Sequence, residues 1–581
     1  MTFAVLPIGD SAVTVEFEER IDVEINQRAL ALADRIDRAA LPGVREVVPT
    51  YRSATVYFDP LRTDVAQLMG RLQVEACQTE PTIQSEPRLI RVPVCYGGAF
   101  GPDLETVAVH AAMSHTQVIE CHSSRTYRVF MLGFVPGFAY MAAVDPRIAM
   151  PRRQTPRVRV AAGSIGIAGV QTGIYPLDTP GGWHVIGRTP VKLFDSVRSE
   201  PFLLASGDSV RFYPIEPADY DRVDEHRGTV SSPPVREPVP RTAFAQSGMC
   251  AHVIRPGLQT TVQDLGRWGW QARGVPVAGP MDLWSHRVAN ALAGNPAVAA
   301  TLEITVTGPE LEFEDDRVAA VAGADFVVTV DGQAMPPREA FRIQAGSRLK
   351  FGARMLGTRA YLAIAGGIDV PPTLGSRATH LPSRLGGLGG RALESGDRLP
   401  LGSIPPRSIA VRAIGANGQE LGLPLSSWYS DRLRPNPNGG LDGRLRVLPG
   451  PQAGWFAAST LDVLQSAPYR LTSNSNRMGF RLDGPLLHHV RDADMISEAT
   501  PLGSLQVPAS GLPILLMADR QTTGGYPSIV VVISADMPVA GQLGPGDLVS
   551  FELCEQSEAV AALAAEERPL AAIETQGPGK E

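Results

Sequence analysis

The stretch MLGFVPGFAYM at residues 131–141, followed by PRRQTPRVRVAAGSIGIAGVQTGIYPLDTPGGWHVIGRTPVKLFD at residues 151–195, decides the fold of the first half of the chain. Glycine and proline recur too often here for a long helix or a simple strand. The pattern predicts short strands joined by tight turns, which is typical of a β-rich barrel or sandwich. We expect this barrel to occupy residues 83–215.

The same stretch contains groups that can bind a ligand. Glycine lets the backbone approach a small molecule closely, and arginine donates paired hydrogen bonds to carboxylate or phosphate oxygens. The alternative is that these residues only close the turns of the barrel. The candidates for substrate binding are Arg157, Gln171, Tyr175 and Arg188, and those for close backbone approach are Gly133, Gly137, Gly181 and Gly182.

Other segments complete the predicted α+β, β-rich architecture. Residues 1–82 alternate strand patterns with two helical patterns, roughly 21–40 and 63–76, and predict a small α/β sandwich. Residues 216–250 collect prolines and predict a linker. The remaining expected units are a second β-rich half at 251–555, split near 405 into two barrel-like parts, and an Ala-rich helix with a flexible tail at 556–581.

A weak repeat runs through the β-rich parts. SGDSVRF at 206–212, AGSRLKF at 345–351, SGDRLPL at 395–401 and PGDLVSF at 545–551 each predict a tight turn that leads into a strand. Several related barrel modules in one chain would explain the repeat. Chance similarity between common turn–strand pieces is the alternative.

The second half contains four polar motifs: TVQDLGRWGW (261–270), SNRMGF (475–480), SEATPLG (497–503) and ADRQTTGGYP (518–527). Acids, amides and guanidinium groups lie close together in them and could orient a planar amide substrate. Salt bridges between each acid and a neighbouring arginine are the structural alternative. The candidates are Asp264, Asp519, Arg520 and Glu498 for catalysis, Gln263, Arg267, Asn476, Arg477, Gln521, Thr522 and Thr523 for binding, and Gly524 and Gly525 for backbone approach; a metal site is not assigned.

Composition excludes several classes of function. A net charge of −7 argues against nucleic-acid binding, and no stretch predicts a signal peptide or a membrane span, so we expect a cytoplasmic location. None of the three lysines (Lys192, Lys350, Lys580) lies in a P-loop pattern. The glycines of 386–390 with Arg391 offer a possible phosphate cradle or a loop without a ligand.

The motifs of both halves resemble the carboxyltransferase-domain family, which includes the allophanate hydrolase subunits and the B and C subunits of 5-oxoprolinase. Residues 3–215 resemble the B subunit, and residues 251–555 resemble the C subunit, so the chain resembles a B–C fusion. The resemblance implies cyclophilin-like barrels. One departure is Ser528, where the family pattern GGYPKI predicts lysine, so no lysine role is carried over.

The resemblance also implies an activity: ATP, with Mg2+, activates the lactam of 5-oxoproline, and a separate A subunit then finishes its cleavage to glutamate. We expect the two halves to pack on each other around one shared cleft, a homo-oligomer, and no covalent biotin on this chain. Two alternatives stay open. One is the carboxyltransferase component of a urea carboxylase (urea amidolyase-like) system, and the other is a regulator that inhibits a sensor kinase.

Overall fold

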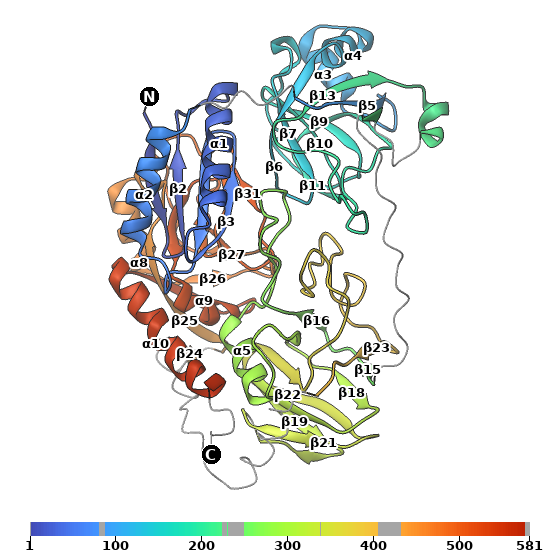
Figure 1. Ribbon diagram of the computed structural model, residues 1–581. Coiled ribbons are helices and arrows are strands. Elements are labelled where there is room, and N and C mark those ends of the chain that lie inside the picture. Colours follow the sequence, from blue (N-terminus) through green and yellow to red (C-terminus); the bar gives the residue numbers. More distant parts are fainter. Residues whose placement is uncertain are drawn as a thin grey trace.

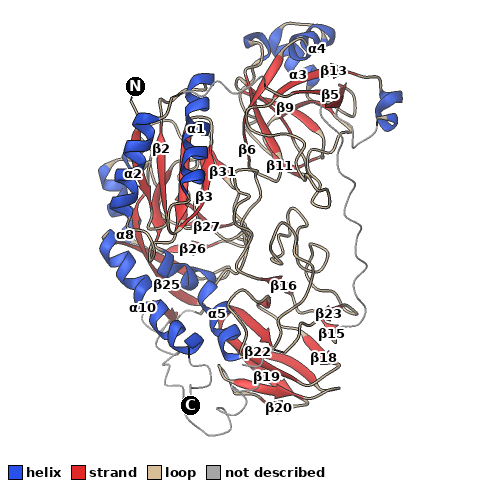
Figure 2. Ribbon diagram, viewed as in Figure 1, coloured by secondary structure: helices blue, strands red, loops and turns tan. Residues whose placement is uncertain are grey.

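The computed structural model describes residues 2–80, 87–223, 229–230, 249–336, 338–404, 432–437 and 439–575. Helices and strands are mixed, with strands dominant, as predicted (Figure 2). The N-terminal domain and the first barrel occupy the upper part of Figure 1, and the second half extends behind and below them. Most of the predicted linker, the predicted break near 405 and residues 576–581 lie outside the described residues.

The N-terminal domain has two layers. Its antiparallel strands run in the order β1-β2-β4-β3, and both helices pack their apolar sides on one face of this sheet. The helices begin at aspartate caps: Asp22 accepts hydrogen bonds from the first turn of α1, and Asp64 does so for α2. The elements are β1 (Ala4–Ile8), β2 (Ala12–Glu16), α1 (Val23–Ala39), β3 (Val44–Pro49), β4 (Ser53–Phe58) and α2 (Val65–Gln78).

The first barrel is closed. Its strands follow the ring β5-β12-β9-β10-β7-β6-β13, and β13 pairs in parallel with β5 to complete it. Helices α3 (Leu104–Ala111) and α4 (His115–Ser123) contribute to the same core. The strands are β5 (Leu89–Tyr96), β6 (Thr126–Gly133), β7 (Phe138–Ala142), β9 (Ser164–Ala168), β10 (Gln171–Ile174), β12 (His184–Arg188) and β13 (Ser209–Pro214). A separate two-stranded antiparallel sheet pairs β8 (Arg157–Val160) with β11 (Thr179–Gly181).

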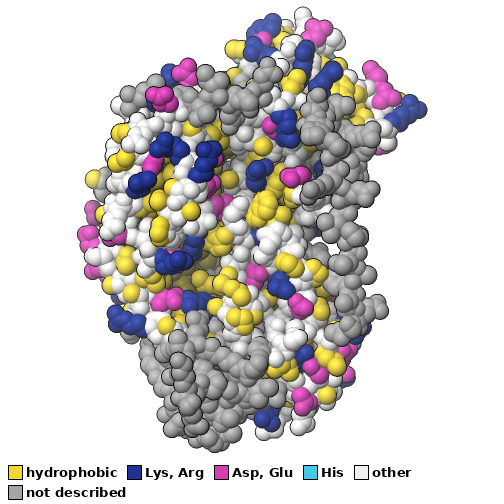
Figure 3. Space-filling view, viewed as in Figure 1, with side chains coloured by type: hydrophobic (Ala, Val, Ile, Leu, Met, Phe, Trp, Pro, Cys, Tyr) yellow, Lys and Arg dark blue, Asp and Glu magenta, His cyan; other side chains and the backbone are white. Residues whose placement is uncertain are grey.

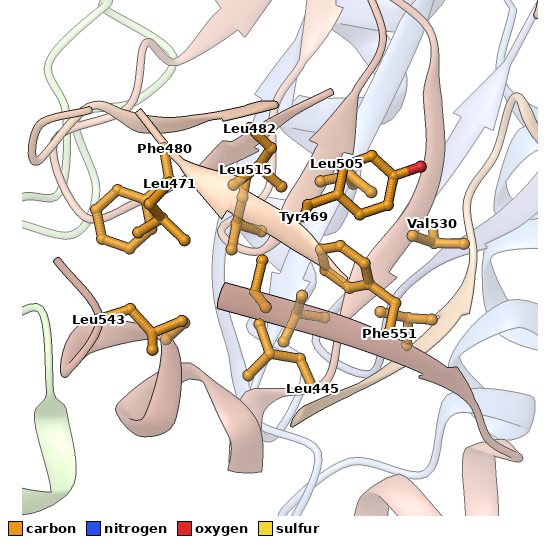
Figure 4. Close-up of a cluster of buried hydrophobic side chains, with 14 of the residues drawn as sticks. Leu445, Tyr469, Leu471, Phe480, Leu482, Leu505, Leu515, Val530, Leu543 and Phe551 are labelled. Carbon is orange, nitrogen blue, oxygen red and sulfur yellow. The ribbon is translucent and has the colours of Figure 1, made fainter. Parts of the chain in front are cut away.

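The second barrel repeats this topology. Its ring is β25-β32-β29-β30-β27-β26-β33, again closed by a parallel pairing between its last and first strands. Leucine, phenylalanine and tyrosine side chains fill its interior (Figure 4). The strands are β25 (Leu441–Pro449), β26 (Tyr469–Leu471), β27 (Gly479–Asp483), β29 (Ser504–Gln506), β30 (Ile514–Leu516), β32 (Ser528–Val532) and β33 (Leu548–Leu553), and β28 (Glu498–Ala499) pairs with β31 (Thr523–Gly524) beside them.

A nine-stranded sheet occupies the part of the second half before this barrel. Its main path runs β16-β17-β22-β18-β15-β23, and within the described residues no pairing joins the two ends of that path. The part of the second half before residue 405, which the sequence predicted to be barrel-like, therefore forms an open sheet instead of a closed ring. Helix α5 (Leu283–Leu292) packs on β19 and β22. The strands are β15 (Cys250–Arg255), β16 (Gln259–Gln263), β17 (Thr301–Thr305), β18 (Glu310–Phe313), β19 (Arg317–Val330), β20 (Gln333–Ala334), β21 (Ala340–Ile343), β22 (Arg348–Ile364) and β23 (Arg398–Pro400).

The remaining helices border the second barrel. They are α8 (Ala458–Ser466), α9 (Met537–Gly541) and the C-terminal α10 (Gln556–Thr575), and α10 packs against α5. Among the described residues, no helix is both long and apolar enough to span a membrane.

Candidate active site

The two halves meet where the N-terminal sheet packs on the second barrel. The face of the sheet opposite α1 and α2 contributes Ile8, Val48 and Tyr57, which pack against Ala499 and Val531. Burial of these side chains stabilises the junction through the hydrophobic effect. The halves are therefore docked domains, as the sequence predicted, rather than units joined only by a linker.

Buried carboxylates of the N-terminal domain fix this junction by accepting hydrogen bonds from the second half. Glu46 accepts from the backbone N–H groups of Gly269 (2.9 Å) and Gln271 (2.6 Å) and from Gln271 Nε2 (3.1 Å). Asp10 accepts from both the N–H and the hydroxyl of Ser534, each at 2.8 Å. Loss of such an acceptor would leave buried donors unsatisfied, so these contacts specify one docking geometry.

The glycine-rich loop of the first barrel also contacts the second half. The N–H of Phe134 donates to Thr523 Oγ1 at 2.9 Å, and the N–H of Gly137 donates to the carbonyl of Arg273 at 2.9 Å. A Cβ atom at Gly133 would overlap the Thr523 side chain. Close backbone approach at Gly133 and Gly137 is thus directed at the other half of the protein.

A cavity of about 820 Å³ lies between the halves. It is large enough for a small-molecule ligand. In Figure 3 hydrophobic side chains gather in a recess at the lower edge of the N-terminal domain, where this cavity lies above α5. Its walls include Arg45, Tyr57, Asp59, Leu61, Arg62, Trp268, Met281, Trp284, Arg287, Leu502, Arg520, Met537, Leu563, Glu566, Glu567 and Leu570.

Arg520 is the predicted catalytic residue that lines this cavity. Its side chain is 5% exposed; Nε donates to the Thr500 carbonyl (2.7 Å) and one terminal nitrogen donates to Gln271 Oε1 (3.2 Å). Burial lowers the pKa of Arg520, and neighbouring Tyr57 opposes this effect. Within the described chain no carboxylate forms an ion pair with it, so a buried positive charge faces the cavity.

Asp519 and Arg477 form a buried ion pair instead of lining the cavity. Arg477 donates to both carboxylate oxygens of Asp519 (3.0 and 2.9 Å), and it also contacts Glu303. Burial alone would lower the pKa of Arg477, but the two carboxylates raise it above its ordinary value. The geometry therefore gives Asp519 a supporting position behind Arg520.

Asp264, Gln263 and Arg267 organise the loop after β16. Asp264 accepts from Ser376 Oγ and from the N–H of Arg377, both at 2.5 Å. Gln263 donates to the carbonyl of Thr379 at 3.1 Å, and Arg267 donates to the carbonyl of Ala378. All three are buried, and none lines the cavity. They hold the segment that includes Trp268 in place.

Glu498 lies at a second point of the junction, where it shares one arginine with Glu16. Arg52 contacts Glu498 and lies 3.2 Å from Glu16. Burial, together with the nearby Glu16, raises the pKa of Glu498 to about 8. A cavity of about 20 Å³, enough for a water molecule, adjoins it and is also lined by Ser528, where the family pattern predicts lysine.

The other candidates of the first half lie on its own barrel. Arg157 donates two 2.7 Å hydrogen bonds to Asp103, and Arg188 lies over the Phe100 ring. Gln171 accepts from the Tyr51 hydroxyl at 2.8 Å. Tyr175 is buried among aromatic rings; a Cβ atom at Gly181 would overlap its ring, and Gly182 lies against Pro156. None of these side chains lines the large cavity.

The remaining candidates of the second half lie outside the strands of the ring, and Gly524 lies in β31. Asn476 accepts from the N–H of Met478 at 2.8 Å, and the carbonyl of Gln521 accepts from Thr500. Thr522 is buried, Gly524 lines the small cavity and Gly525 lies near Arg152. Within the described ranges no cluster of three His, Cys, Asp or Glu residues could hold a metal ion.

Sequence reasoning missed most of the cavity wall. Arg45 and Arg62 come from the N-terminal domain, and Glu566 comes from α10, where no motif marks them. Trp268 lies inside the motif TVQDLGRWGW and could have been named from it. Burial and the nearby Asp536 and Asp282 raise the pKa of Glu566 to about 9, so this carboxyl is neutral at pH 7.

Comparison with known proteins identifies the class to which this arrangement belongs. Residues 273–553 match the model for carboxyltransferase domain, subdomain A and B, and residues 3–204 match carboxyltransferase domain, subdomain C and D. The chain therefore belongs to the carboxyltransferase-domain family, with both parts present in one polypeptide.

Individual relatives correspond to the separate halves. The 5-oxoprolinase C subunit of Escherichia coli K12 is 39% identical over 53% of this chain and 93% of its own length. The 5-oxoprolinase B subunit of Escherichia coli O157:H7 is 45% identical over 36% of this chain and 94% of its own length. Urea amidolyase of Saccharomyces cerevisiae is 33% identical over 52% of this chain but only 16% of its own length. The chain is thus similar to a fusion of the B and C subunits.

A solved structure shows both halves together. The crystal structure of TTHA0988 is 36% identical, with a TM-score of 0.75, and covers 93% of this chain and 99% of that one. The Kluyveromyces lactis urea amidolyase structure is 30% identical, with a TM-score of 0.51, over 57% of this chain and 20% of that one. The order of the two halves therefore has a structural counterpart along nearly the whole chain.

Proposed function

We propose that the chain is the fused B and C component of an ATP-dependent 5-oxoprolinase, which acts with a separate A subunit. The observation that carries the proposal is that one chain contains nearly complete counterparts of the B and C subunits of 5-oxoprolinase. Their docking around a shared cavity supports joint action of the two halves.

The proposed chemistry activates the lactam carbonyl, which amide resonance makes a poor electrophile. The lactam oxygen attacks the γ-phosphorus of ATP, the bond to the β–γ bridging oxygen breaks, and ADP leaves. Water then adds to the activated carbon with loss of one proton, and the C–N bond breaks as the nitrogen gains a proton, which gives an acyl phosphate. A second water hydrolyses this acyl phosphate and releases inorganic phosphate. The sum is 5-oxoproline, ATP and two water molecules giving glutamate, ADP and phosphate.

The residues of the cavity fit the first step. The buried cation of Arg520 would attract the substrate carboxylate or the transferred phosphoryl group, and its hydrogen bonds to Thr500 and Gln271 fix its position. The aromatic part of the wall would help to exclude water and so limit hydrolysis of the activated lactam. Mg2+ bound to the nucleotide would offset charge on the phosphates.

The test separates the component from the complete enzyme. We expect the purified chain to form little or no glutamate from 5-oxoproline and ATP, and we expect a cognate A subunit to restore glutamate and ADP formation in equal amounts. Chromatography of glutamate and a coupled assay of ADP provide the two readouts. Full activity without the A subunit, or none with it, would contradict the proposal.

The carboxyltransferase component of a urea-converting system is the second candidate, because the second half also matches urea amidolyase. In that case the same preparation would consume urea when given a biotinylated partner and bicarbonate. Urea turnover in place of 5-oxoproline turnover would favour this candidate.

A further inference from the structure

The walls of the 820 Å³ cavity differ in chemistry. Three lining arginines come from the N-terminal domain and the second barrel, and α5 supplies a fourth, Arg287. The segment after β16, α5 and α10 supply most of the aromatic and aliphatic surface. Trp268 is held by neighbours on the cavity wall: the Arg45 guanidinium lies 5.2 Å from its ring centre, and the Tyr57 ring lies 6.2 Å away. Such a wall suits a ligand with a flat ring at one end and negative charge at the other.

The cavity carries an excess of positive charge. Four lining arginines (Arg45, Arg62, Arg287 and Arg520) face three acids (Asp59, Glu566 and Glu567), of which Glu566 is neutral at pH 7. Asp59 pairs with Arg45 at 3.2 Å, and Glu567 pairs with Arg287. These two ion pairs use Arg45 and Arg287, so Arg62 and Arg520 remain, and neither forms an ion pair within the described chain.

A buried cation without an ion-pair partner is costly unless an anion joins it. Arg520 is 5% exposed, and its hydrogen bonds go to two neutral oxygens. Burial lowers its pKa, and Glu46 and Asp519 lie close enough to oppose this effect, but neither forms an ion pair with it within the described chain. Arg62, by contrast, lies at the exposed rim of the cavity. Together they form an entrance and an inner site for a group with several negative charges, such as a chain of phosphates.

The other phosphate candidate from the sequence is filled by its own chain. A Cβ atom at Gly386 or Gly390 would overlap neighbouring backbone, so this turn is packed against protein. Its arginine, Arg391, donates two 2.7 Å hydrogen bonds to Asp397 and is already neutralised. The contrast favours the large cavity as the site for a polyphosphate.

The volume of the cavity favours a nucleotide over a small carboxylate as its ligand. A cavity of about 820 Å³ falls in the range that holds drug-sized ligands, and a five-membered lactam would fill only a small part of it. A nucleotide would use the aromatic wall and the arginines together and leave space for the lactam beside its terminal phosphate.

We propose that this cavity is a nucleoside triphosphate site, with the phosphates at Arg62 and Arg520 and the base against the Trp268 wall. The identification of the nucleotide as a reaction partner rests on the proposed function, whereas the binding site itself rests on the cavity. The nucleotide therefore enters between the halves and contacts both of them.

Calorimetric titration of the full chain with the non-hydrolysable β,γ-imido analogue of ATP and Mg2+ tests the site without the A subunit. We expect binding by the unchanged chain and a loss of ~10-fold or more in affinity for Arg62→Ala, because a charge-assisted contact is removed. Arg62 is exposed, so this variant should fold. Trp268→Leu should also weaken binding, and Arg159→Ala, on an exposed arginine of the first barrel, should not.

Three outcomes overturn the site. The first is that the unchanged chain does not bind the analogue, and the second is that the Arg62→Ala and Trp268→Leu variants bind it as tightly as the unchanged chain. The third is that inorganic triphosphate binds as tightly as the analogue, which would reveal an anion site without a base pocket. The proposed function is judged separately. Glutamate formation with the A subunit, together with unchanged nucleotide affinity in both variants, would keep the function and remove this site. Weakened nucleotide binding in both variants, without 5-oxoproline turnover when the A subunit is present, would keep this site and remove the proposed function.

Discussion

Individual residues show how a polar motif can be recognised while its role remains open. The sequence singles out the motif ADRQTTGGYP, but of its predicted site residues Arg520 alone lines the cavity, whereas Asp519 holds Arg477. The two side chains are adjacent in sequence and point to different partners. Composition and spacing reveal that polar groups gather; they do not reveal which group faces a ligand, because this depends on contacts with Gln271 and Tyr57 far away in the sequence.

Glu498 gives a prediction at this scale. Its pKa is about 8 in the folded protein against 4.5 for an ordinary glutamate, so between these values the folded state holds a proton that the unfolded state has lost. The free energy of unfolding therefore falls as pH rises across this window. We expect Glu498→Gln to lose less stability between pH 5 and pH 8 than the unchanged chain, measured by urea unfolding.

The matched control for this experiment is Glu394→Gln, because Glu394 is an exposed glutamate whose side chain is 69% accessible. Its unfolding midpoint should follow the unchanged chain at every pH. Identical pH slopes for Glu498→Gln and the unchanged chain would show that the carboxyl is ionised throughout, with Arg52 satisfying both glutamates.

Elements are easier to predict than roles. The helical patterns at 21–40 and 63–76 correspond to α1 (Val23–Ala39) and α2 (Val65–Gln78). Of the repeated turns, SGDSVRF and PGDLVSF lead into the equivalent strands β13 and β33, each parallel to the first strand of its barrel. Gly207 and Gly546 both have φ of 95°, and the aspartate after each accepts a 2.7 Å hydrogen bond from the N–H three residues earlier. A local turn of this kind is readable from sequence.

Helix α10 leads to a prediction about stability. Leu570 is 1% exposed and packs in one cluster with Trp284 and Val288 of α5, beside the cavity. Leu570→Ala should lower the free energy of unfolding by about 2–5 kcal/mol, because it removes buried methyl groups and leaves a void. Thermal unfolding measures the loss, and Leu258→Ala, at a leucine that is 68% exposed, should change it little. Equal effects of the two variants would show that α10 is not docked on α5 in solution.

The whole molecule contains two barrels of the same topology. The weak repeat indicated that the barrels are related, and the family resemblance implied barrels in both halves. The ring β5-β12-β9-β10-β7-β6-β13 has the same order as β25-β32-β29-β30-β27-β26-β33, and each has an accessory two-stranded sheet, β8 with β11 and β28 with β31. The shared cavity could not be predicted. Its walls come from short segments between residues 11 and 570, and the first half contributes through its N-terminal domain rather than through the barrel motifs predicted to do so.

The junction predicts that covalent linkage between the halves is dispensable. The two parts contact each other through the apolar cluster around Tyr57 and Val531 and through buried acceptors such as Glu46. We expect a chain cut near Pro234, which lies outside the described residues, to yield two fragments that co-elute as one complex and keep the activity found with the A subunit. Size-exclusion chromatography and the glutamate assay are the measurements.

Glu46→Ala supplies the sensitive variant of the same experiment. It removes the acceptor for the N–H groups of Gly269 and Gln271 and should weaken reassociation of the fragments. The buried N–H of Gln271 left unsatisfied would cost roughly 1–3 kcal/mol. Glu105→Ala changes an exposed glutamate on the first barrel and should leave reassociation unaltered. Fragments that fold but never bind each other would refute the docked junction, and with it the cavity that needs both halves to form.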